Sequence, residues 1–154
     1  MIEVPHVVDV SAQATAVIHM VVPAAEIRQV MGPGISEVVA AVAAQGLPHA
    51  GAWFTHHFRP PAEVFDFEVG IPVVGAIAPT GRVRPAHLPA ARVARTVYVG
   101  GYEGLAEAWG AFEEWLRANG HHPATGLWEH YAVGPESGLA PTAWRTQLVR
   151  PLQS

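Results

Sequence analysis

The chain contains no cysteine and no lysine, and only 14% of its 154 residues are charged. Because cysteine is absent, the protein has no disulfides, no thiolate metal ligands and no cysteine nucleophile. The positive charges come from nine arginines scattered along a chain whose formal net charge is −4. Direct nucleic-acid binding usually needs a basic stripe, so the composition argues against that function.

Long hydrophobic runs are also missing. Half of the residues are hydrophobic, but no segment is long enough to span a bilayer. Residues 1–5 show no basic region followed by an apolar core, as a signal peptide would have. We therefore expect a cytoplasmic protein with no membrane contact, folded as one domain that buries about two thirds of its unfolded surface.

Hydrophobic periodicity predicts both strands and helices in the first half of the chain. The elements are a strand over 15–22, a helical turn over 24–30, a helix over 35–45, and strands over 51–58 and 64–74. The sequence Met31-Gly32-Pro33-Gly34 is typical of a break before the helix. A proline-dotted segment over 79–89 shows little apolar periodicity and is expected to be a linker.

The second half repeats this order. It predicts a strand over 92–99, a helix over 104–119, a strand over 127–133, a loop over 134–141 and a strand over 144–152. The helix is the clearest element, because its apolar residues form one stripe of a 3.6-residue helix. That stripe consists of Leu105, Trp109, Phe112 and Leu116. Gly120 is the expected helix stop.

The two halves match after a shift of 74 positions. Gly46 then falls on Gly120, and Phe54 falls on Trp128. We predict an α+β fold of two pseudo-symmetric βαββ repeats with antiparallel sheets and a ligand cleft between them. The first repeat covers about 12–76, the linker about 78–90 and the second repeat about 91–153.

Glu129 is the most informative polar residue. Strand alternation places it on one face with Leu127, Tyr131 and Val133. A carboxylate among large apolar neighbours is costly to bury unless it meets a cation, a proton or hydrogen-bond donors. Glu129 is thus a candidate anchor for a cationic ligand, with aromatic rings adding cation–π attraction. The alternative is an edge position where it pairs with a surface arginine.

Two other kinds of site find little support. The histidine pairs at 56–57 and 121–122 are adjacent in sequence, and neighbours on a strand point to opposite faces, so neither pair chelates an ion easily. The sequence also has no histidine with a carboxylate at ligand spacing, so we expect no metal. Gly100-Gly101 precedes a helix but lacks the GxGxxG spacing, and Glu103 would repel an anion there. A tight turn is the simpler interpretation, and no cofactor is expected.

Four motifs in order resemble the GyrI-like effector-binding domains, which also form the ligand-binding part of AraC-type and MerR-type regulators. These motifs are Phe67-Glu68-Val69-Gly70-Ile71-Pro72-Val73, Val99-Gly100-Gly101-Tyr102-Glu103-Gly104, Trp128-Glu129-His130-Tyr131, and Trp144-Arg145-Thr146 with Arg150-Pro151-Leu152. The resemblance implies two βαββ units enclosing an aromatic cleft into which a glutamate reaches. Regulators of this family carry a separate DNA-binding module. The two repeats already occupy nearly all of the 154 residues, so we expect a stand-alone effector domain.

Carried over by position, Glu129 matches the family's glutamate and Tyr131 the tyrosine two residues on. His57 stands where the first repeat of the family often has tyrosine. The predicted ligand contacts are Glu129, Tyr131, His57, Trp53, Trp109, Phe112 and Tyr98. For the aromatic residues the alternative is a place in the hydrophobic core, and Tyr98 and Tyr102 could each simply cap it.

The resemblance implies binding of a small hydrophobic or cationic aromatic molecule, for sensing, sequestration or detoxification. Some members hydrolyse cyclopropane-containing toxins, and in that case Glu129 would be the acid or base and Tyr131 would orient the substrate. Other members act on a protein partner, for which the loop over 134–141 is the candidate contact. The sequence leaves these alternatives open. It also does not decide whether the protein is a monomer or a homodimer.

Overall fold

The structure is a computed structural model that describes residues 1–59 and 62–153. Its contacts divide the chain into two compact units. Unit 1 consists of Met1–Val10 and Ala91–Ser154, and unit 2 of Ser11–Ala90. Each unit contains four antiparallel strands and one long helix. Over the described residues, none of the helices combines the length and apolar character needed to cross a membrane.

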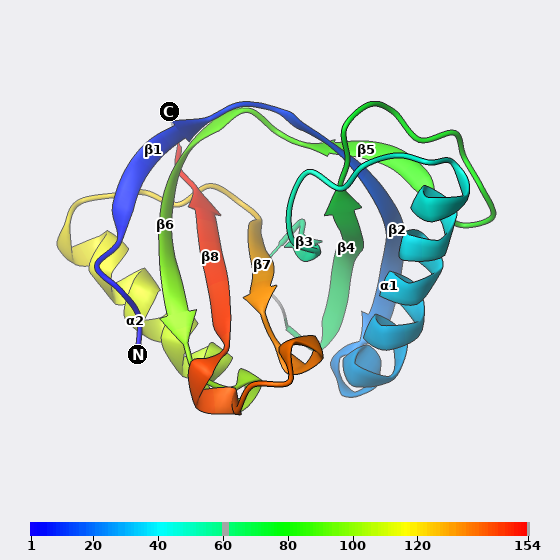
Figure 1. Cartoon of the computed structure of the whole chain (residues 1–154). Helices are drawn as coiled ribbons and strands as arrows, with labels where there is room; N and C mark the ends of the chain where they lie inside the picture. The colour runs from blue at the N-terminus through cyan, green and yellow to red at the C-terminus, as the bar shows by residue number, and fades with distance from the viewer. Residues whose placement is uncertain (60–61, 154) are drawn as a thin grey trace. The chain divides into compact units, whose positions relative to one another are not determined.

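Unit 2 is built around a long second strand. Its elements are β2 (Gln13–Pro23), η1 (Ala24–Glu26), α1 (Ile27–Ala44), β3 (Phe54–His57), β4 (Val64–Pro72) and β5 (Arg84–Leu88). The strands lie in the order β5-β2-β4-β3, and every pairing among them is antiparallel. Helix α1 packs along β2 and β4, as Figure 1 shows.

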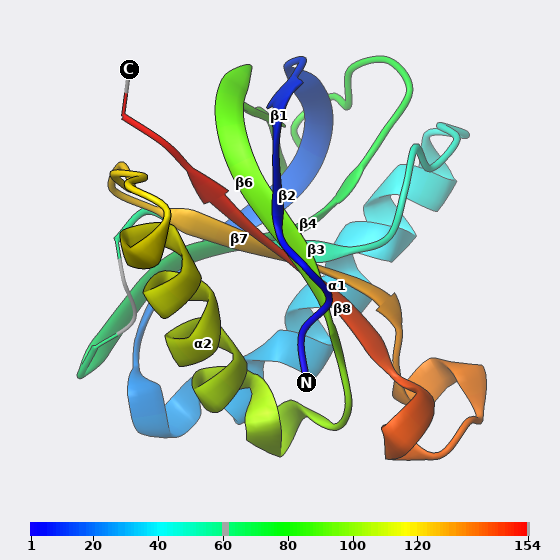
Figure 2. The same cartoon turned by 90° about the vertical axis from the view of Figure 1, so that its left-hand side faces the viewer.

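Unit 1 has the same plan. Its elements are β1 (His6–Val10), β6 (Ala91–Val99), η2 (Tyr102–Gly104), α2 (Leu105–Ala118), β7 (Leu127–Val133), η3 (Pro135–Ser137), η4 (Pro141–Ala143) and β8 (Arg145–Pro151). The strand order is β1-β6-β8-β7, again antiparallel. Figure 2 shows α2 and the connection that returns the chain to β7.

The ends of the two helices show the repeat in detail. Gly46 and Gly120 follow α1 and α2 with φ angles of 65° and 72°. The next amide in each unit bonds back into the last helical turn, Leu47 to the Val42 carbonyl and His121 to the Leu116 carbonyl. Left-handed glycines of this kind end helices because they lack a Cβ. The predicted α+β fold of two antiparallel βαββ repeats is confirmed.

The predicted break before the first helix is wrong. Helix α1 begins at Ile27 and runs through Pro33 to Ala44. Proline inside a helix removes one hydrogen bond, but packing offsets this cost. A Cβ on the buried Gly34 would lie 2.6 Å from the Met20 side chain, so this glycine lets the helix approach the sheet closely. Tertiary packing therefore overrides the local signal.

Two edge strands were not predicted. Strand β5 lies inside the segment expected to be a linker, and it pairs with the first half of β2. Strand β1 pairs with β6, about 85 residues farther along the chain, since His6 faces Arg95 in the register. Both strands have only five residues, and exposed and partly buried positions do not alternate along them, so their sequences carry no clean alternation.

Each unit has its own hydrophobic core between its helix and its sheet. The core of unit 2 joins α1 to β2 and β4 and includes the fully buried Val38 and Phe67. The core of unit 1 joins α2 to β6 and β8 and includes Phe112, Leu116 and Leu148. In each unit the core residues lie on the strand face that packs against the helix. Residues that alternate with them therefore point to the opposite face of the sheet.

Candidate functional site

Glu129 lies on the helix-facing side of unit 1. In the register of β7 and β8, Glu129 faces Leu148, and Tyr131 faces Thr146. Leu148 packs in the core against α2, so its cross-strand neighbour Glu129 points to the same face. The predicted alternation is therefore confirmed as far as Tyr131. Beyond it an irregularity shifts the register before Val133.

Two aromatic side chains donate hydrogen bonds to the Glu129 carboxylate. The indole Nε1 of Trp109 donates to Oε2 at 2.6 Å, and the hydroxyl of Tyr131 donates to Oε1 at 2.6 Å. Trp109 comes from the apolar stripe of α2, and Tyr131 is two residues along the same strand. The structure thus brings three of the predicted site residues together within one unit.

The carboxylate is held in an environment that disfavours its charge. Glu129 is only 9% exposed. Burial raises its pKa above the ordinary value, while the hydrogen bonds from Tyr131 and Trp109 act in the opposite direction. Within residues 1–59 and 62–153, no arginine, histidine or amino terminus forms an ion pair with Glu129. The alternative of a surface arginine partner is therefore not seen there.

Tyr102 joins this group, although the sequence did not select it. Its ring meets Tyr131 edge-on, with centroids 5.8 Å apart, and lies 5.0 Å from the ring of Trp144. Tyr102 lies in η2 and Trp144 follows η4, so segments far apart in sequence supply these rings. The only available signal was the Gly100-Gly101-Tyr102 turn at the start of α2.

Two predicted contacts lie in the core instead. Phe112 is fully buried in the core of unit 1. Tyr98 is 6% exposed, and its hydroxyl donates to the Gly101 carbonyl at 2.7 Å. That bond fixes the turn before α2, and the turn's Gly100 has a φ of 148°, which a residue with a side chain rarely adopts. Both aromatic residues thus occupy the core positions that the sequence left open as the alternative, and their contact with a ligand stays a prediction.

The remaining predicted residues, Trp53 and His57, belong to unit 2. Trp53 is partly buried and packs against the unit 2 core. His57 is buried, with its ring stacked on Phe67 at 5.3 Å and set edge-on to Phe65 at 5.6 Å. Burial lowers the His57 pKa to about 4, helped by the charge of His56. His57 is therefore neutral at neutral pH, and its buried Nδ1 has no hydrogen-bond partner among the described residues.

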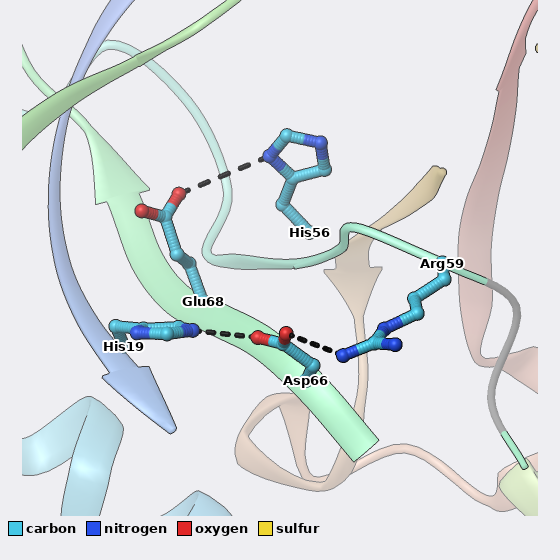
Figure 3. Close-up of polar contacts among 5 residues, drawn as sticks. All are labelled: His19, His56, Arg59, Asp66 and Glu68. Atoms are coloured by element: carbon cyan, nitrogen blue, oxygen red, sulfur yellow. Dashed lines mark hydrogen bonds and ion pairs between the residues drawn. The ribbon is translucent and has the colours of Figure 1, made fainter. Parts of the chain in front are cut away.

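A second polar cluster lies on the opposite face of the unit 2 sheet. Asp66 sits between His19 and Arg59 and bonds both, at 2.6 and 3.2 Å (Figure 3). Beside it, His56 reaches toward Glu68, with 3.8 Å between Nδ1 and Oε1. The hydrogen bond from His19 is the main reason that the Asp66 pKa is lowered, with Arg59 also contributing. Each carboxylate of this cluster thus has a histidine beside it.

The cluster also bears on metal binding. Among the residues that the structure describes, no three His, Asp or Glu side chains are arranged to hold a metal ion. The adjacent histidines 56 and 57 point to opposite faces of β3, since one approaches Glu68 and the other stacks on Phe67. This is the arrangement that strand alternation requires.

Comparison with known proteins identifies the family. The sequence matches the GyrI-like small molecule binding domain over residues 4–153. No curated protein sequence matches the chain. The crystal structure of the EcmrR C-terminal domain superimposes with a TM-score of 0.84 at 18% identity, covering 97% of both chains. EcmrR in a DNA complex gives the same score at 19% identity, and this chain spans 58% of that longer one.

Two further solved structures share the fold. A hydrolase from Listeria innocua has a TM-score of 0.66 at 12% identity, covering 97% of this chain and 91% of its own. SAV2435 bound to tetraphenylphosphonium has a TM-score of 0.67 at 6% identity, covering 99% and 95%. At such identities the likeness concerns the fold alone. The match over nearly the whole chain shows that this protein belongs to the GyrI-like small-molecule binding domain family.

Proposed function

We propose that this domain binds a small organic cation with a flat aromatic part, and that the carboxylate of Glu129 anchors it. The observation that carries the proposal is a buried carboxylate with two aromatic hydrogen-bond donors and no cationic partner among the described residues. A buried anion without a countercharge is unfavourable, and a bound cation would supply that charge.

The side chains around Glu129 suit such a ligand. Trp109 and Tyr102 are partly exposed, and Tyr131 lies between them at the carboxylate. The faces of tryptophan and tyrosine rings attract cations, more strongly where water is excluded. SAV2435, which shares this fold, was solved with tetraphenylphosphonium, a cation that carries aryl groups. Binding of this kind would serve sensing, sequestration or detoxification.

The test compares two probes of the same shape and opposite charge, tetraphenylphosphonium and tetraphenylborate, by isothermal titration calorimetry. We expect the wild type to prefer the phosphonium. Glu129→Gln should weaken phosphonium binding about 10- to 100-fold, because it removes the charge that attracts the cation; this loss corresponds to about 1.4–2.8 kcal/mol. Borate binding should stay the same or become tighter, because the substitution removes a negative charge that repels the anion. The matched control is Glu107→Gln, which removes the same charge from an exposed position on α2. Equal phosphonium binding by wild type and Glu129→Gln would refute the proposal.

A second candidate function is hydrolysis of a strained electrophile. The favouring observation is that burial raises the pKa of Glu129 above its ordinary value, the direction that general acid–base catalysis by a carboxyl group uses. Water would add across the strained bond, with its oxygen on one carbon and its proton, relayed by Glu129, on the other end. Incubation with a cyclopropane-bearing electrophile should then increase the compound's mass by one water with wild type but not with Glu129→Gln.

A further inference from the structure

The hydroxyl of Tyr102 is a buried donor that the described part of the protein leaves without a partner. It has no hydrogen-bond partner among the described residues, although its oxygen is shielded from solvent. Most buried polar side-chain atoms in folded proteins have such a partner, and leaving one unpaired costs free energy. Tyr98, four residues earlier, shows the ordinary case, since its hydroxyl bonds the Gly101 carbonyl. The unpaired hydroxyl of Tyr102 therefore needs an explanation.

The surroundings of Tyr102 hold it in place without satisfying it. Its ring packs between those of Tyr131 and Trp144. Its hydroxyl lies against Gly134, where an added Cβ would stand 2.5 Å from the phenolic oxygen and 3.0 Å from Oε2 of Glu136. Glycine at this position thus leaves the space in which the hydroxyl sits.

Electrostatics keep this hydroxyl protonated. Burial, followed by the nearby charges of Glu136 and Glu129, raises the pKa of Tyr102 to about 12. At neutral pH the group is therefore a donor. The same carboxylates would repel an anion, and a cation offers no lone pair to receive the proton. The partner that fits the Tyr102 hydroxyl is a neutral acceptor atom.

A second buried hydroxyl lies next to Tyr131 on the neighbouring strand. Thr146 faces Tyr131 across β7 and β8, is fully buried, and its Oγ1 has no partner within the described part of the chain. Tyr131 itself is engaged, because its hydroxyl donates to Glu129. Two residues in contact with or paired to this tyrosine, Tyr102 and Thr146, thus have buried hydroxyls without a partner among the described residues.

We infer that Tyr102 donates a hydrogen bond to a neutral acceptor of the ligand, such as a carbonyl or ether oxygen. This inference rests on the proposed function and narrows the ligand class. The ligand is then an organic cation whose aromatic part also carries a neutral oxygen, with Glu129 addressing the charge and Tyr102 the oxygen. A purely hydrocarbon cation would leave the Tyr102 hydroxyl unpaired.

The test uses two probes that differ only in that one has a carbonyl oxygen where the other has a CH2 group. (4-Acetylphenyl)trimethylammonium carries a carbonyl, and (4-isopropenylphenyl)trimethylammonium has nearly the same shape without an acceptor. We expect wild type to bind the acetyl probe about two- to tenfold more tightly, as one net hydrogen bond allows. Tyr102→Phe should bind both probes equally. Tyr98→Phe, which also loses a phenolic hydroxyl, should keep the wild-type preference.

A measurement without ligand gives independent support. Removing an unpaired hydroxyl should leave the melting temperature of Tyr102→Phe unchanged or raise it, whereas Tyr98→Phe should melt lower. A preference for the acetyl probe that survives in Tyr102→Phe, or no preference in wild type, would overturn the inference. The proposed function would still stand if both probes bind and Glu129→Gln weakens them. Failure of folded wild type to bind either probe would overturn both.

Discussion

Strands β3 and β7 occupy equivalent places in the two repeats, yet they present different chemistry at the same two positions. Where β7 has Glu129 and Tyr131, β3 has Thr55 and His57. In unit 1 the pair forms a hydrogen-bonded carboxylate and phenol. In unit 2 the ring of His57 is packed between phenylalanines as a neutral group. The same two positions thus hold a carboxylate and a phenol in one repeat, and a threonine and a neutral imidazole in the other.

The helices differ in the same way. Trp109 of α2 corresponds to Ile35 of α1 after the shift of 74 positions. The indole nitrogen of Trp109 bonds Glu129, whereas isoleucine has no donor to offer. A buried carboxylate at the position of Thr55 would therefore lack the support that Glu129 receives. The comparison teaches that a helix and a strand of the same repeat must change together to create such a site.

The largest expected effect concerns the two cores, where Phe112 corresponds to Val38. Both side chains are fully buried. Phe112→Ala should lower the free energy of unfolding by about 3–5 kcal/mol, because it leaves a large cavity. Val38→Ala removes less apolar surface and should cost about 2 kcal/mol. Urea denaturation followed by circular dichroism measures both, and a larger loss for Val38→Ala would contradict the packing described for the two units.

A second expected effect concerns pH. The pKa of His57 is lowered from 6.5 to about 4 in the fold, so the unfolded chain binds the proton more readily between these values. The stability that His57 contributes is present above pH 6.5 and is lost as the pH falls toward 4. The loss should reach about 3 kcal/mol. Denaturant titrations at pH 4 to 7 measure it.

The pH effect separates the two repeats. His57→Phe keeps a ring but removes the titration, so its stability should vary less with pH than that of the wild type. His87→Gln, at an exposed position of β5, should behave like the wild type. Glu129 has the opposite sign, because its raised pKa favours the fold at low pH and that contribution is lost as the pH rises. A pH profile unchanged by His57→Phe would contradict the buried, neutral state of His57.

The smallest expected effect concerns Trp109. Trp109→Phe keeps an aromatic ring but removes the donor to Glu129, so affinity for tetraphenylphosphonium should fall about two- to tenfold. Trp115→Phe serves as the matched control, because Trp115 lies on the same helix and stacks on His121 instead. Isothermal titration calorimetry measures the affinity of both variants for tetraphenylphosphonium. Equal losses would mean that the indole bond to Glu129 does not distinguish Trp109.

Much of this arrangement was predictable from periodicity. The alternation of β7 places Glu129 and Tyr131 on one face, and the 3.6-residue stripe of α2 places Trp109 above the sheet. The shift of 74 positions predicts matching helix ends at Gly46 and Gly120, which the hydrogen bonds confirm. These features depend on local pattern, and local pattern is what a single sequence contains.

Other features depend on contacts between distant segments. Strand β1 pairs with β6 across more than 80 residues, and its own five residues show no alternation. Tyr98 and Tyr102 both flank a glycine turn, and nothing local shows that Tyr98 bonds Gly101 while Tyr102 reaches Tyr131. Helix α1 passes through Pro33 because the buried Gly34 packs against β2 and β4. In each case tertiary contact decides between local alternatives.

The most direct test of the central claim is the pKa of Glu129 itself, measured by NMR on protein labelled with carbon-13 at the glutamate carboxyl groups. The account predicts one carboxyl whose pKa is raised above the ordinary glutamate value and whose signal is absent in Glu129→Gln. Saturating tetraphenylphosphonium should lower its pKa, because a cation stabilises the carboxylate. An ordinary pKa for Glu129, or one that the bound cation leaves unchanged, would contradict the claim that Glu129 anchors a cationic ligand.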